Sequence, residues 1–542
     1  MSLDTVDHAV ISQALIAAAR EMGVKLVRSA YSPIVREAND CSAALLDAQG
    51  RVVSQAELIP MQLGPIGTTF RPCAELFPPD TLQEGDFYIN NDPFNGGQHI
   101  PDVFLFSPIF FQGELIAFSA TVAHHLDLGG GAPGLNPEAT DIHQEGIIFP
   151  PSKYNQLRDW NGGPLERLVR ANIRVPDQTI GDFNAQFAAN AIGARRICDL
   201  CEKFGLQHVK SSMNALLDYS ERRMRAAIKD VPDGVYVGED ALDDDGISED
   251  PLPVKAKVII AGDQVTVDFD GTCDQVKTNI NCPFSSTIAA ALSCVKSVLT
   301  SDDIPFNEGA KRPITVSAPY GSLLNPKPPA PVRARMLSGY RAFNAVMKAL
   351  AGAAPEKVIA AGFDTTESCC LSHLGEDGYS IYLEIFGGGY GASAHADGCD
   401  AVDSPLSNCS NIPIEAMDME HDYFRVVEYC AVSGSGGAGM YRGGMGLRRV
   451  YEVLEDNVTF ATYSDRFRLA PSGLFGGESG ACASTCVVRE GKTIELGSKL
   501  SFKLMKGDRL IMTTGGGAGY GDPETRLPEL LASDAVLEGV SS

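Results

Sequence analysis

The 542-residue sequence lacks the features that would assign it to a membrane or to a nucleic acid. It contains no run of about 18 apolar residues, the length that a transmembrane helix needs. Its first residues carry acidic side chains where a signal peptide would carry basic ones, so we expect no secretory leader. Positive charge is scarce, because 44 Lys and Arg face 69 Asp and Glu, which gives a net charge of −25. This balance argues against nucleic acid or an anionic membrane as a partner.

Nucleotide-binding motifs are missing as well. No glycine-rich run follows a strand and opens a helix at the spacing of a dinucleotide fingerprint. The segment Gly491-Lys492-Thr493 lacks the earlier glycine of a P-loop, because Cys486 stands in its place. The 14 Cys have no regular spacing, which is typical of reduced thiols and favours a cytoplasmic protein. The pair Cys198 and Cys201 lies in a helical pattern, and we interpret it as helix packing.

The residues that are present indicate an α+β protein with three regions. Residues 1–231 combine long helical patterns, the first from Asp4 to about Ser29, with strand-like hairpins. Residues 232–380 are mixed α/β, and the acidic run from Asp240 to Asp250 is interpreted as a solvated loop. Residues 381–542 are rich in glycine and strand-like. For this last region we predict antiparallel β structure in which the glycine runs form tight turns.

The stretch from Asn90 to Gly130 carries the strongest chemical signal. It holds three of the nine histidines, and acidic residues stand next to them. Two apolar runs rich in Val, Ile and Phe, separated by a Gln-Gly turn signal, predict a hairpin. A hairpin brings its two open ends together, so His99, Asp102 and His124 are expected to converge. Two imidazoles and one carboxylate suit a borderline divalent ion such as Zn, Mn, Fe or Co.

The length of the hairpin loop decides whether His124 or His125 shares a face with Asp102. A two-residue Gln112-Gly113 loop places His125 on that face, whereas a three-residue loop that starts at Phe111 places His124 there. We favour the three-residue loop, because Gly at its last position suits the left-handed conformation and Gln is a poor first residue for a type I′ turn. This register predicts His124 as the ligand.

Five other polar residues near these segments are candidates for the same site. Asp40 enters a predicted strand and would add a fourth ligand, although by itself it is typical of a cap or turn. Asp127 or His125 would accept a proton from water or orient a ligand. His143 and Glu145 interrupt an apolar segment; they are candidates for supporting or substrate-binding groups, with a surface loop as the alternative.

Seven segments together resemble one family. They are REANDCSAALLD, NNDPFNGGQHIPD, VAHHLDLGG, EGIIFPPSK, NPKPPAPV, SGSGGAGMYRGGMGL and TTGGGAGYGDP. From about Ala9 to Pro523 the chain resembles the hydantoinase B/oxoprolinase family. These are the smaller subunits of ATP-dependent cyclic-amide hydrolases, the matching half of 5-oxoprolinase, and relatives in acetone and acetophenone carboxylases. The resemblance implies that a metal is held by His99, Asp102, His124 and Asp40.

The resemblance also implies a division of labour between two subunits. A larger, hydantoinase A-type subunit would bind ATP and Mg and phosphorylate the carbonyl oxygen of a lactam, hydantoin or 5-oxoproline. The chain itself would carry Zn, Mn or Fe and complete the hydrolysis with activated water. One alternative is the corresponding subunit of an acetone- or acetophenone-type carboxylase, although such subunits are often longer. Another is a non-catalytic, metal-stabilised scaffold for the larger subunit.

Overall fold

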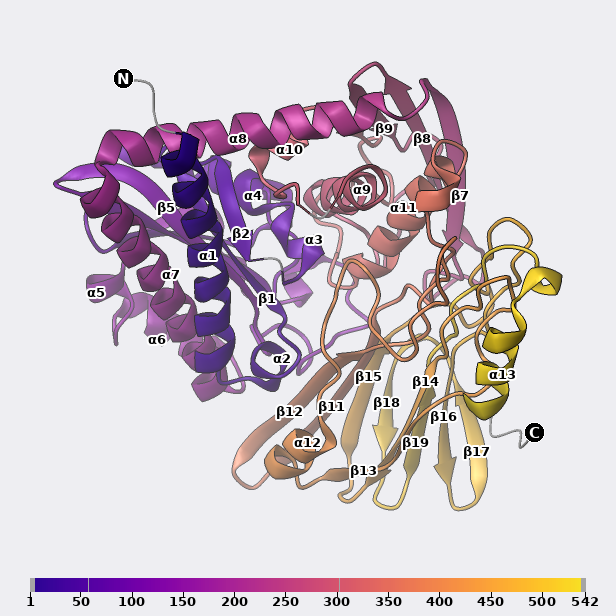
Figure 1. Ribbon diagram of the computed structural model, residues 1–542. Coiled ribbons are helices and arrows are strands. Elements are labelled where there is room, and N and C mark those ends of the chain that lie inside the picture. The colour runs from indigo at the N-terminus through magenta and orange to yellow at the C-terminus, as the bar shows by residue number, and fades with distance from the viewer. Residues whose placement is uncertain (1–4, 57, 302, 538–542) are drawn as a thin grey trace.

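The computed structural model describes residues 5–56, 58–301 and 303–537. Asp4, the predicted start of the first helix, lies outside these residues, and helix α1 is described as Thr5–Ser29. Helices and antiparallel sheets share the chain, as predicted for an α+β protein, with long helices near the N-terminus and strands near the C-terminus (Figure 1). Among the described helices, none combines the length and apolar character that a membrane span requires.

The N-terminal region is built on an antiparallel six-stranded sheet with the order β2-β1-β5-β4-β3-β6. Its two longest strands, β4 and β5, form the central hairpin. Their Val, Ile and Phe side chains suit a pleated surface that is covered on both faces. The strands are β1 (Cys41–Asp47), β2 (Val52–Ala56), β3 (Asp86–Asn90), β4 (Asp102–Phe111), β5 (Glu114–His124) and β6 (Ser152–Asn155).

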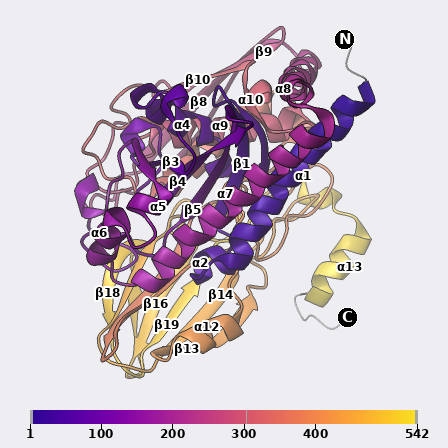
Figure 2. The same ribbon diagram turned by 90° about the vertical axis from the view of Figure 1, so that its left-hand side faces the viewer.

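Alternate residues of β4 pack against helices on opposite faces of this sheet. Leu105 belongs to a cluster with Phe183 and Phe187 of the long helix α7. Phe104 belongs to another cluster with Phe70 of α4. Helices α1 and α7 run side by side across one face of the sheet (Figure 2). The further helices are α2 (Pro33–Arg36), α3 (Pro60–Leu63), α4 (Ile66–Leu76), α5 (Gln156–Asp159), α6 (Pro164–Asn172), α7 (Pro176–Phe204) and α8 (Leu206–Lys229).

The middle of the chain adds a second sheet, ordered β10-β9-β8-β7, in which only the β10–β9 pair is parallel. Helix α11 packs across β7 and β8 and against α9. Every residue of α11 except Lys348 is buried, so this helix is enclosed by protein on nearly all sides. The elements are β7 (Gly234–Leu242), β8 (Leu252–Ala261), β9 (Gln264–Asp268), α9 (Phe284–Leu299), α10 (Glu308–Lys311), β10 (Ile314–Ser317) and α11 (Arg335–Leu350).

Two antiparallel sheets make up most of the C-terminal part, with the orders β12-β11-β15-β18 and β13-β14-β19-β16-β17 (Figure 1). Strand β11 begins before residue 381, where the last region is predicted to start, and the three-part division of the chain stays a prediction. The elements are β11 (Glu367–Gly375), β12 (Gly378–Phe386), α12 (Ile414–Glu420), β13 (Phe424–Ala431), β14 (Leu447–Val453), β15 (Val458–Tyr463), β16 (Ser484–Arg489), β17 (Lys492–Leu496), β18 (Lys499–Leu504), β19 (Arg509–Thr513) and α13 (Pro528–Leu537).

The glycine runs of this part pack backbone against backbone, so the prediction that they form tight turns is wrong for most of them. A Cβ on Gly389 would lie 2.1 Å from the carbonyl oxygen of Gly444 and 2.1 Å from the amide nitrogen of Gly517. None of these three glycines has a positive φ. Glycine is needed here because the absent side chain lets three segments touch, and not because of a left-handed turn.

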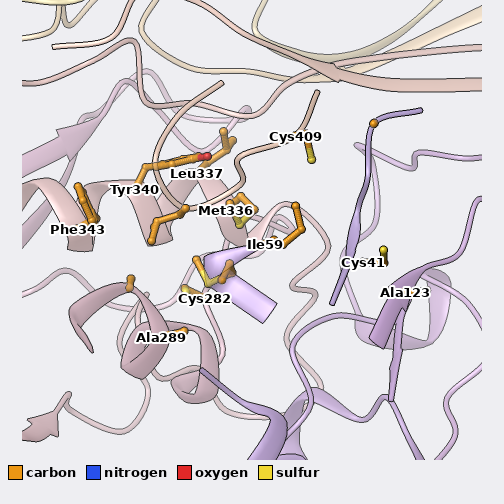
Figure 3. Packing of buried hydrophobic residues seen from close by; sticks show 14 of the residues in the cluster. Cys41, Ile59, Ala123, Cys282, Ala289, Met336, Leu337, Tyr340, Phe343 and Cys409 are labelled. Atoms are coloured by element: carbon orange, nitrogen blue, oxygen red, sulfur yellow. The ribbon is translucent and has the colours of Figure 1, made fainter. Parts of the chain in front are cut away.

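One hydrophobic cluster of buried residues draws members from all three parts of the chain. Figure 3 shows a portion of it, where Met336, Leu337 and Tyr340 of α11 lie near Ile59 and near Ala289 of α9. The same cluster includes Cys409. The packing therefore joins the N-terminal sheet, the middle helices and the C-terminal loops around one interior, and the candidate site lies within it.

Candidate metal centre

The β4–β5 hairpin places Asp102 directly opposite His124. Directly opposed residues of an antiparallel pair share one face, so His124 lies beside Asp102. The predicted three-residue loop is wrong, because Phe111 pairs with Glu114 and the loop is Gln112-Gly113, with both residues at positive φ. A bulge between Ile109 and Phe110 then shifts the register by one residue. His124 therefore lies on the predicted face, but the cause is this bulge and not the length of the loop.

His99, Asp102 and His124 form a buried group whose ligand atoms all lie within 4.8 Å of one another. His99 Nε2 is 3.1 Å from Asp102 Oδ1, and His124 Nδ1 is 3.5 Å from the same oxygen. Ligand atoms about 2.1 Å from a shared ion lie about 3 to 3.5 Å apart, so these spacings match a metal site. His99 Nε2 and His124 Nε2 are buried without a hydrogen-bond partner among the described residues. This group could therefore hold a divalent ion.

Asp40 lies next to the group and contacts it through His124. Its Oδ2 is 3.5 Å from His124 Nδ1, while its Oδ1 accepts a hydrogen bond of 2.7 Å from Gln62 Nε2. Gln62 Nε2 also lies 3.4 Å from Asp102 Oδ1, so one buried amide contacts both carboxylates. Asp40 stands at the start of β1, where the chain enters the sheet next to β5. Its role as a fourth ligand stays a prediction.

Two arginines, Arg333 just before α11 and Arg335 at its first position, support the histidine and the carboxylate. His99 Nδ1 lies 2.8 Å from the carbonyl oxygen of Arg333 and 2.9 Å from Arg335 Nη1. Only the first contact is a hydrogen bond when Nδ1 carries the proton, and that tautomer leaves the Nε2 lone pair free for an ion. Arg335 Nη2 donates to Asp102 Oδ2, which fixes the other oxygen of the carboxylate toward the histidines.

Burial and charge set the protonation of these groups in the metal-free chain. Burial, together with the charge of Arg335, lowers the pKa of His99 to about 3, so its imidazole is neutral. Burial alone would raise the pKa of Asp102, but the charge of Arg335 and the contacts with His99 and His124 hold it well below its ordinary value. Burial raises the pKa of Asp40 to about 6, against the opposing effect of His124. A neutral His99 beside an ionised Asp102 is the combination that binds metal.

The group opens into a cavity of about 50 Å³ whose walls come from three parts of the chain. Asp40, His99 and His124 line it from the N-terminal sheet, and Arg333 lines it from the segment before α11. Tyr463 lines it from the end of β15. The space exceeds the roughly 10–15 Å³ that one water molecule needs, so an ion with water would fit. Apolar and sulfur-bearing side chains make up much of the remaining lining: Ile59, Met61, Leu135, Met336, Leu383, Ile385 and Cys409.

His125 and Asp127, the predicted proton acceptors, do not line this cavity. His125 points to the opposite face of the sheet, where its ring stacks on Phe183 at 4.0 Å and its Nε2 lies 3.0 Å from Gln186 Oε1. Asp127 pairs with Arg174 at 3.1 Å. The geometry assigns both residues to the packing of α7 against the sheet, and a catalytic role for either finds no support in it.

His143 and Glu145, the predicted supporting or substrate-binding groups, lie in different surroundings, since one is exposed and the other is buried. His143 is exposed, and its backbone N–H donates a hydrogen bond to Asp141. Its imidazole has no hydrogen bond among the described residues. Glu145 is buried, and its Oε1 accepts hydrogen bonds of 2.9 Å from the backbone N–H groups of Val332 and Arg333. Glu145 therefore braces the segment whose carbonyl supports His99, although it does not line the cavity.

Four residues at the site, Gln62, Arg333, Arg335 and Tyr463, are not among those predicted from the sequence. Each stands in a segment with no motif of its own, and each reaches the site through tertiary packing. The only signal for the two arginines is their place in RAR, directly after the proline-rich NPKPPAPV and at the start of a buried helix. Two positive charges at the start of a buried helix, in so acidic a chain, mark them as candidates for pairing with the predicted carboxylates.

Together, the fold and the cavity define an α+β protein with a candidate divalent-metal centre of two histidines and one aspartate. The chain belongs to the hydantoinase B/oxoprolinase family, whose model matches residues 4–523.

Two relatives in this family carry names that state an enzyme activity. The chain is 36% identical, over 99% of its length and 93% of the other's, to a Pseudomonas protein provisionally named as the B component of a D-/L-hydantoinase. It is 31% identical to the beta subunit of the caprolactamase of Pseudomonas jessenii, over 97% of this chain and 92% of that one. Both relatives are named as one part of a larger enzyme.

Solved structures support the same grouping. The ATP-dependent caprolactamase of Pseudomonas jessenii superimposes with a TM-score of 0.90 at 28% identity, over 100% of this chain and 95% of that chain. Acetone carboxylase in its nucleotide-free form gives a TM-score of 0.88 at 18% identity, over 99% of this chain and 78% of that chain. The second likeness shows a shared fold alone.

Proposed function

We propose that this chain is the metal-bearing subunit of an ATP-dependent cyclic-amide hydrolase and that it acts with a larger ATP-binding subunit. The observation that carries the proposal is the buried His99–Asp102–His124 group at the wall of an enclosed cavity. The family and the names of its hydantoinase and caprolactamase members supply the substrate class. Since the sequence has no P-loop or dinucleotide fingerprint, we assign ATP and Mg to the partner.

An amide resists attack because its nitrogen donates electron density into the carbonyl group. In the proposed reaction, phosphorylation of the amide oxygen by the partner removes this resistance and creates a leaving group. His99, Asp102 and His124 would hold Zn, Mn or Fe, with Asp40 as a further ligand. When bound, such an ion lowers the pKa of water to about 7 and so supplies a nucleophile at neutral pH.

The other residues around the cavity orient the ligands and exclude bulk water. The carbonyl of Arg333 keeps the proton of His99 on Nδ1, which directs Nε2 toward the ion site. Arg335 holds one oxygen of Asp102 and compensates its buried charge, while Gln62 contacts both Asp40 and Asp102. The apolar lining lowers the local dielectric constant, which strengthens every electrostatic contact with the reacting group.

The test is coexpression with the larger subunit, followed by a screen of caprolactam, hydantoin, N-methylhydantoin and 5-oxoproline with ATP. We expect the complex to open at least one ring and the isolated chain neither to hydrolyse ATP nor to open any. His99→Ala should leave the complex intact on size exclusion but abolish ring opening. His143→Ala, an exposed histidine, is the matched control and should keep full activity.

Each alternative has its own outcome in this screen. A complex that consumes acetone and bicarbonate with ATP, and opens no ring, is a carboxylase. A complex in which His99→Ala retains ring opening makes this chain a scaffold. ATP turnover by the isolated chain in the presence of a lactam would overturn the division of labour itself. Elemental analysis of the purified complex identifies the ion.

A further inference from the structure

Arg333 is a buried cation without a counter-ion in the wall of the cavity. The residue is 6% exposed and lines the cavity that contains the candidate metal ligands. No hydrogen bond or ion pair to its guanidinium occurs among the described residues, and its Nε and Nη2 are buried without a partner. A buried, unpaired guanidinium is costly, because a charge removed from water needs compensation by a partner.

The neighbouring Arg335 shows what an ordinary buried arginine does in this protein. Its guanidinium pairs with Asp102, so its charge is compensated inside the chain. The positive charge of Arg333 acts on the carboxyl group of Glu145 and lowers its pKa, against the larger opposing effect of burial. The two side chains nevertheless form no ion pair among the described residues. Glu145 instead uses one oxygen to accept the backbone N–H groups of residues 332 and 333. The guanidinium of Arg333 is thus left for a group that enters the cavity.

Two further donors line the same cavity. The hydroxyl oxygen of Tyr463 accepts hydrogen bonds from the backbone N–H of Asn136 at 3.2 Å and from Asn279 Nδ2 at 3.0 Å. Its own O–H has no acceptor among the described residues, and burial raises its pKa, so the proton is retained. Thr366 Oγ1 is buried with no partner in the part of the chain that the structure describes. The cavity therefore presents a cation and two hydroxyl groups, which together suit an anion.

We propose that Arg333, Tyr463 and Thr366 bind an oxyanion carried by the substrate, in the same cavity as the metal ligands. The planar guanidinium fork matches the two oxygens of a carboxylate or a phosphoryl group. One source of such an anion is a phosphoryl group placed on the amide oxygen, and the other is a carboxylate on the ring. This inference rests on the proposed function, because it names a part of the substrate that the same site would hold.

The anion would lie close to the metal ligands for a structural reason. The backbone carbonyl of Arg333 accepts the hydrogen bond from His99 Nδ1, so one residue contacts the ligand through its backbone while its side chain lines the cavity. Binding at the guanidinium therefore anchors the substrate beside the ion site. The same arrangement makes Arg333→Gln a clean probe, because the substitution keeps the backbone contact with His99.

The experiment is titration calorimetry on the full chain with inorganic phosphate, 5-oxoproline and 2-pyrrolidone, which is the same ring without the carboxylate. We compare the wild-type chain with Arg333→Gln, Thr366→Val and the control Arg158→Gln, which alters an exposed arginine. Elemental analysis checks that all four chains hold the same metal content. Removal of one charge-assisted contact should weaken anion binding about 10- to 100-fold in Arg333→Gln.

Melting temperature supplies a readout that a purely structural arginine would not reproduce. Phosphate should raise the melting temperature of the wild-type chain through mass action and should have little effect on Arg333→Gln. Without phosphate, Arg333→Gln should melt no lower than wild type, because its guanidinium has no partner to lose among the described residues. Thr366→Val likewise removes an unpartnered hydroxyl and should weaken anion binding without loss of stability.

The two sources give different patterns. Phosphate binding that depends on Arg333, with 5-oxoproline no better than 2-pyrrolidone, assigns the site to a phosphoryl group. Binding of 5-oxoproline that depends on Arg333, with no effect on 2-pyrrolidone, assigns it to a ring carboxylate. Equal affinity of wild type and Arg333→Gln for both anions overturns the inference. That failure would leave the hydrolase proposal standing, since ring opening is measured on the coexpressed complex and depends on His99.

Discussion

His124 and His125 are neighbours in sequence with the same side chain, yet the pleat of β5 gives them opposite surroundings. His124 faces Asp40 and Asp102 in the cavity, whereas His125 faces Phe183 and Gln186 beneath α7. The difference follows from the period of two along a strand, which sends successive side chains to opposite faces. At the residue scale, the contacts of these two histidines therefore depend on their position along the strand, since their side chains are identical.

Loss of either histidine should produce a distinct result. His124→Ala should lose most bound metal, because it removes a ligand, and should change the free energy of unfolding little in a metal-free buffer. His125→Ala should retain metal but lose about 1–3 kcal/mol of stability, because the buried amide of Gln186 loses its partner. Elemental analysis after brief dialysis and urea unfolding measure the two effects. Full metal occupancy in His124→Ala with depletion in His125→Ala would refute the assignment.

A buried carboxyl group of β11 gives a pH-dependent prediction outside the site. Burial raises the pKa of Glu367 to about 8, and its Oε2 accepts a hydrogen bond from Ser464. The folded chain therefore holds a proton that the unfolded chain releases near the ordinary pKa of 4.5. Stability from this group is fully present below about 4.5 and declines as the pH rises toward about 8.

Glu367→Gln should remove that decline. Relative to wild type, the variant should gain stability progressively between about pH 5 and pH 8, as measured by urea midpoints at each pH. Glu356→Gln, at an exposed carboxylate, is the control and should follow wild type throughout. A parallel decline in Glu367→Gln and wild type would assign the proton uptake to another group.

At the element scale, the β4–β5 hairpin combines an ordinary turn with a bulge that resets its register. Gln112 and Gly113 occupy the two positive-φ positions that a type I′ turn requires, at +52° and +82°. The turn alone would pair Asp102 with Ala123, and the bulge beside Phe110 moves that pairing to His124. The metal group thus depends on an irregularity close to the turn of the hairpin.

Substitutions in this turn should change stability in opposite directions. Gln112→Asn should stabilise the chain by up to about 1 kcal/mol, because Asn-Gly is the preferred type I′ pair. Gly113→Ala should destabilise it by about 1–2 kcal/mol, since a Cβ disfavours the left-handed conformation even though the space around Gly113 is open. Both are measured by urea unfolding, and metal content should stay unchanged in both. A stabilising Gly113→Ala would contradict the observed turn.

The sequence predicts the hairpin, its convergent ends and the central triad, because strand patterns and turn residues are local signals. It does not predict the bulge at Phe110, since the inserted residue carries no special side chain and the partner strand decides where it falls. Tyr463 and the two arginines give at most a weak local signal, because they lie far from the triad along the chain, with a separation of 236 residues between Arg335 and His99. Gln62 lies only 40 residues from Asp102, but no motif in its segment marks it. The prediction of turns from the glycine runs fails for a related reason. In a sequence, glycines that let remote backbone segments touch cannot be told from glycines that form turns.

At the scale of the whole molecule, part of the predicted acidic loop joins the middle region to the C-terminal sheets. Asp243 is buried, and its carboxylate accepts the backbone N–H groups of Phe467, Arg468 and Leu469 at 2.6 to 3.0 Å. Asp240 pairs with Arg341 and Arg466. The prediction of a solvated run is wrong for these two residues, because Asp240 forms ion pairs and Asp243 is buried with its carboxylate bonded to backbone N–H groups.

Removal of this junction should weaken the fold as a whole. Asp243→Ala leaves three partly buried backbone N–H groups without this acceptor and should cost about 1–3 kcal/mol of unfolding free energy. Asp250→Ala, an exposed member of the same acidic run, should change stability by less than about 0.5 kcal/mol. Urea unfolding of the two variants measures both values. Equal stability of Asp243→Ala and wild type would show that the junction does not contribute to the free energy of unfolding.

The placement of Arg333 and Arg335 far along the chain has a consequence for biosynthesis. A ribosome releases Asp40, His99, Asp102 and His124 well before it makes the segment that closes the cavity over them. All six strands of the N-terminal sheet, from β1 to β6, precede that segment, so they are synthesised while Asp102 has no Arg335 to compensate its charge. The order of synthesis thus leaves these four side chains uncovered until the chain has grown past residue 335.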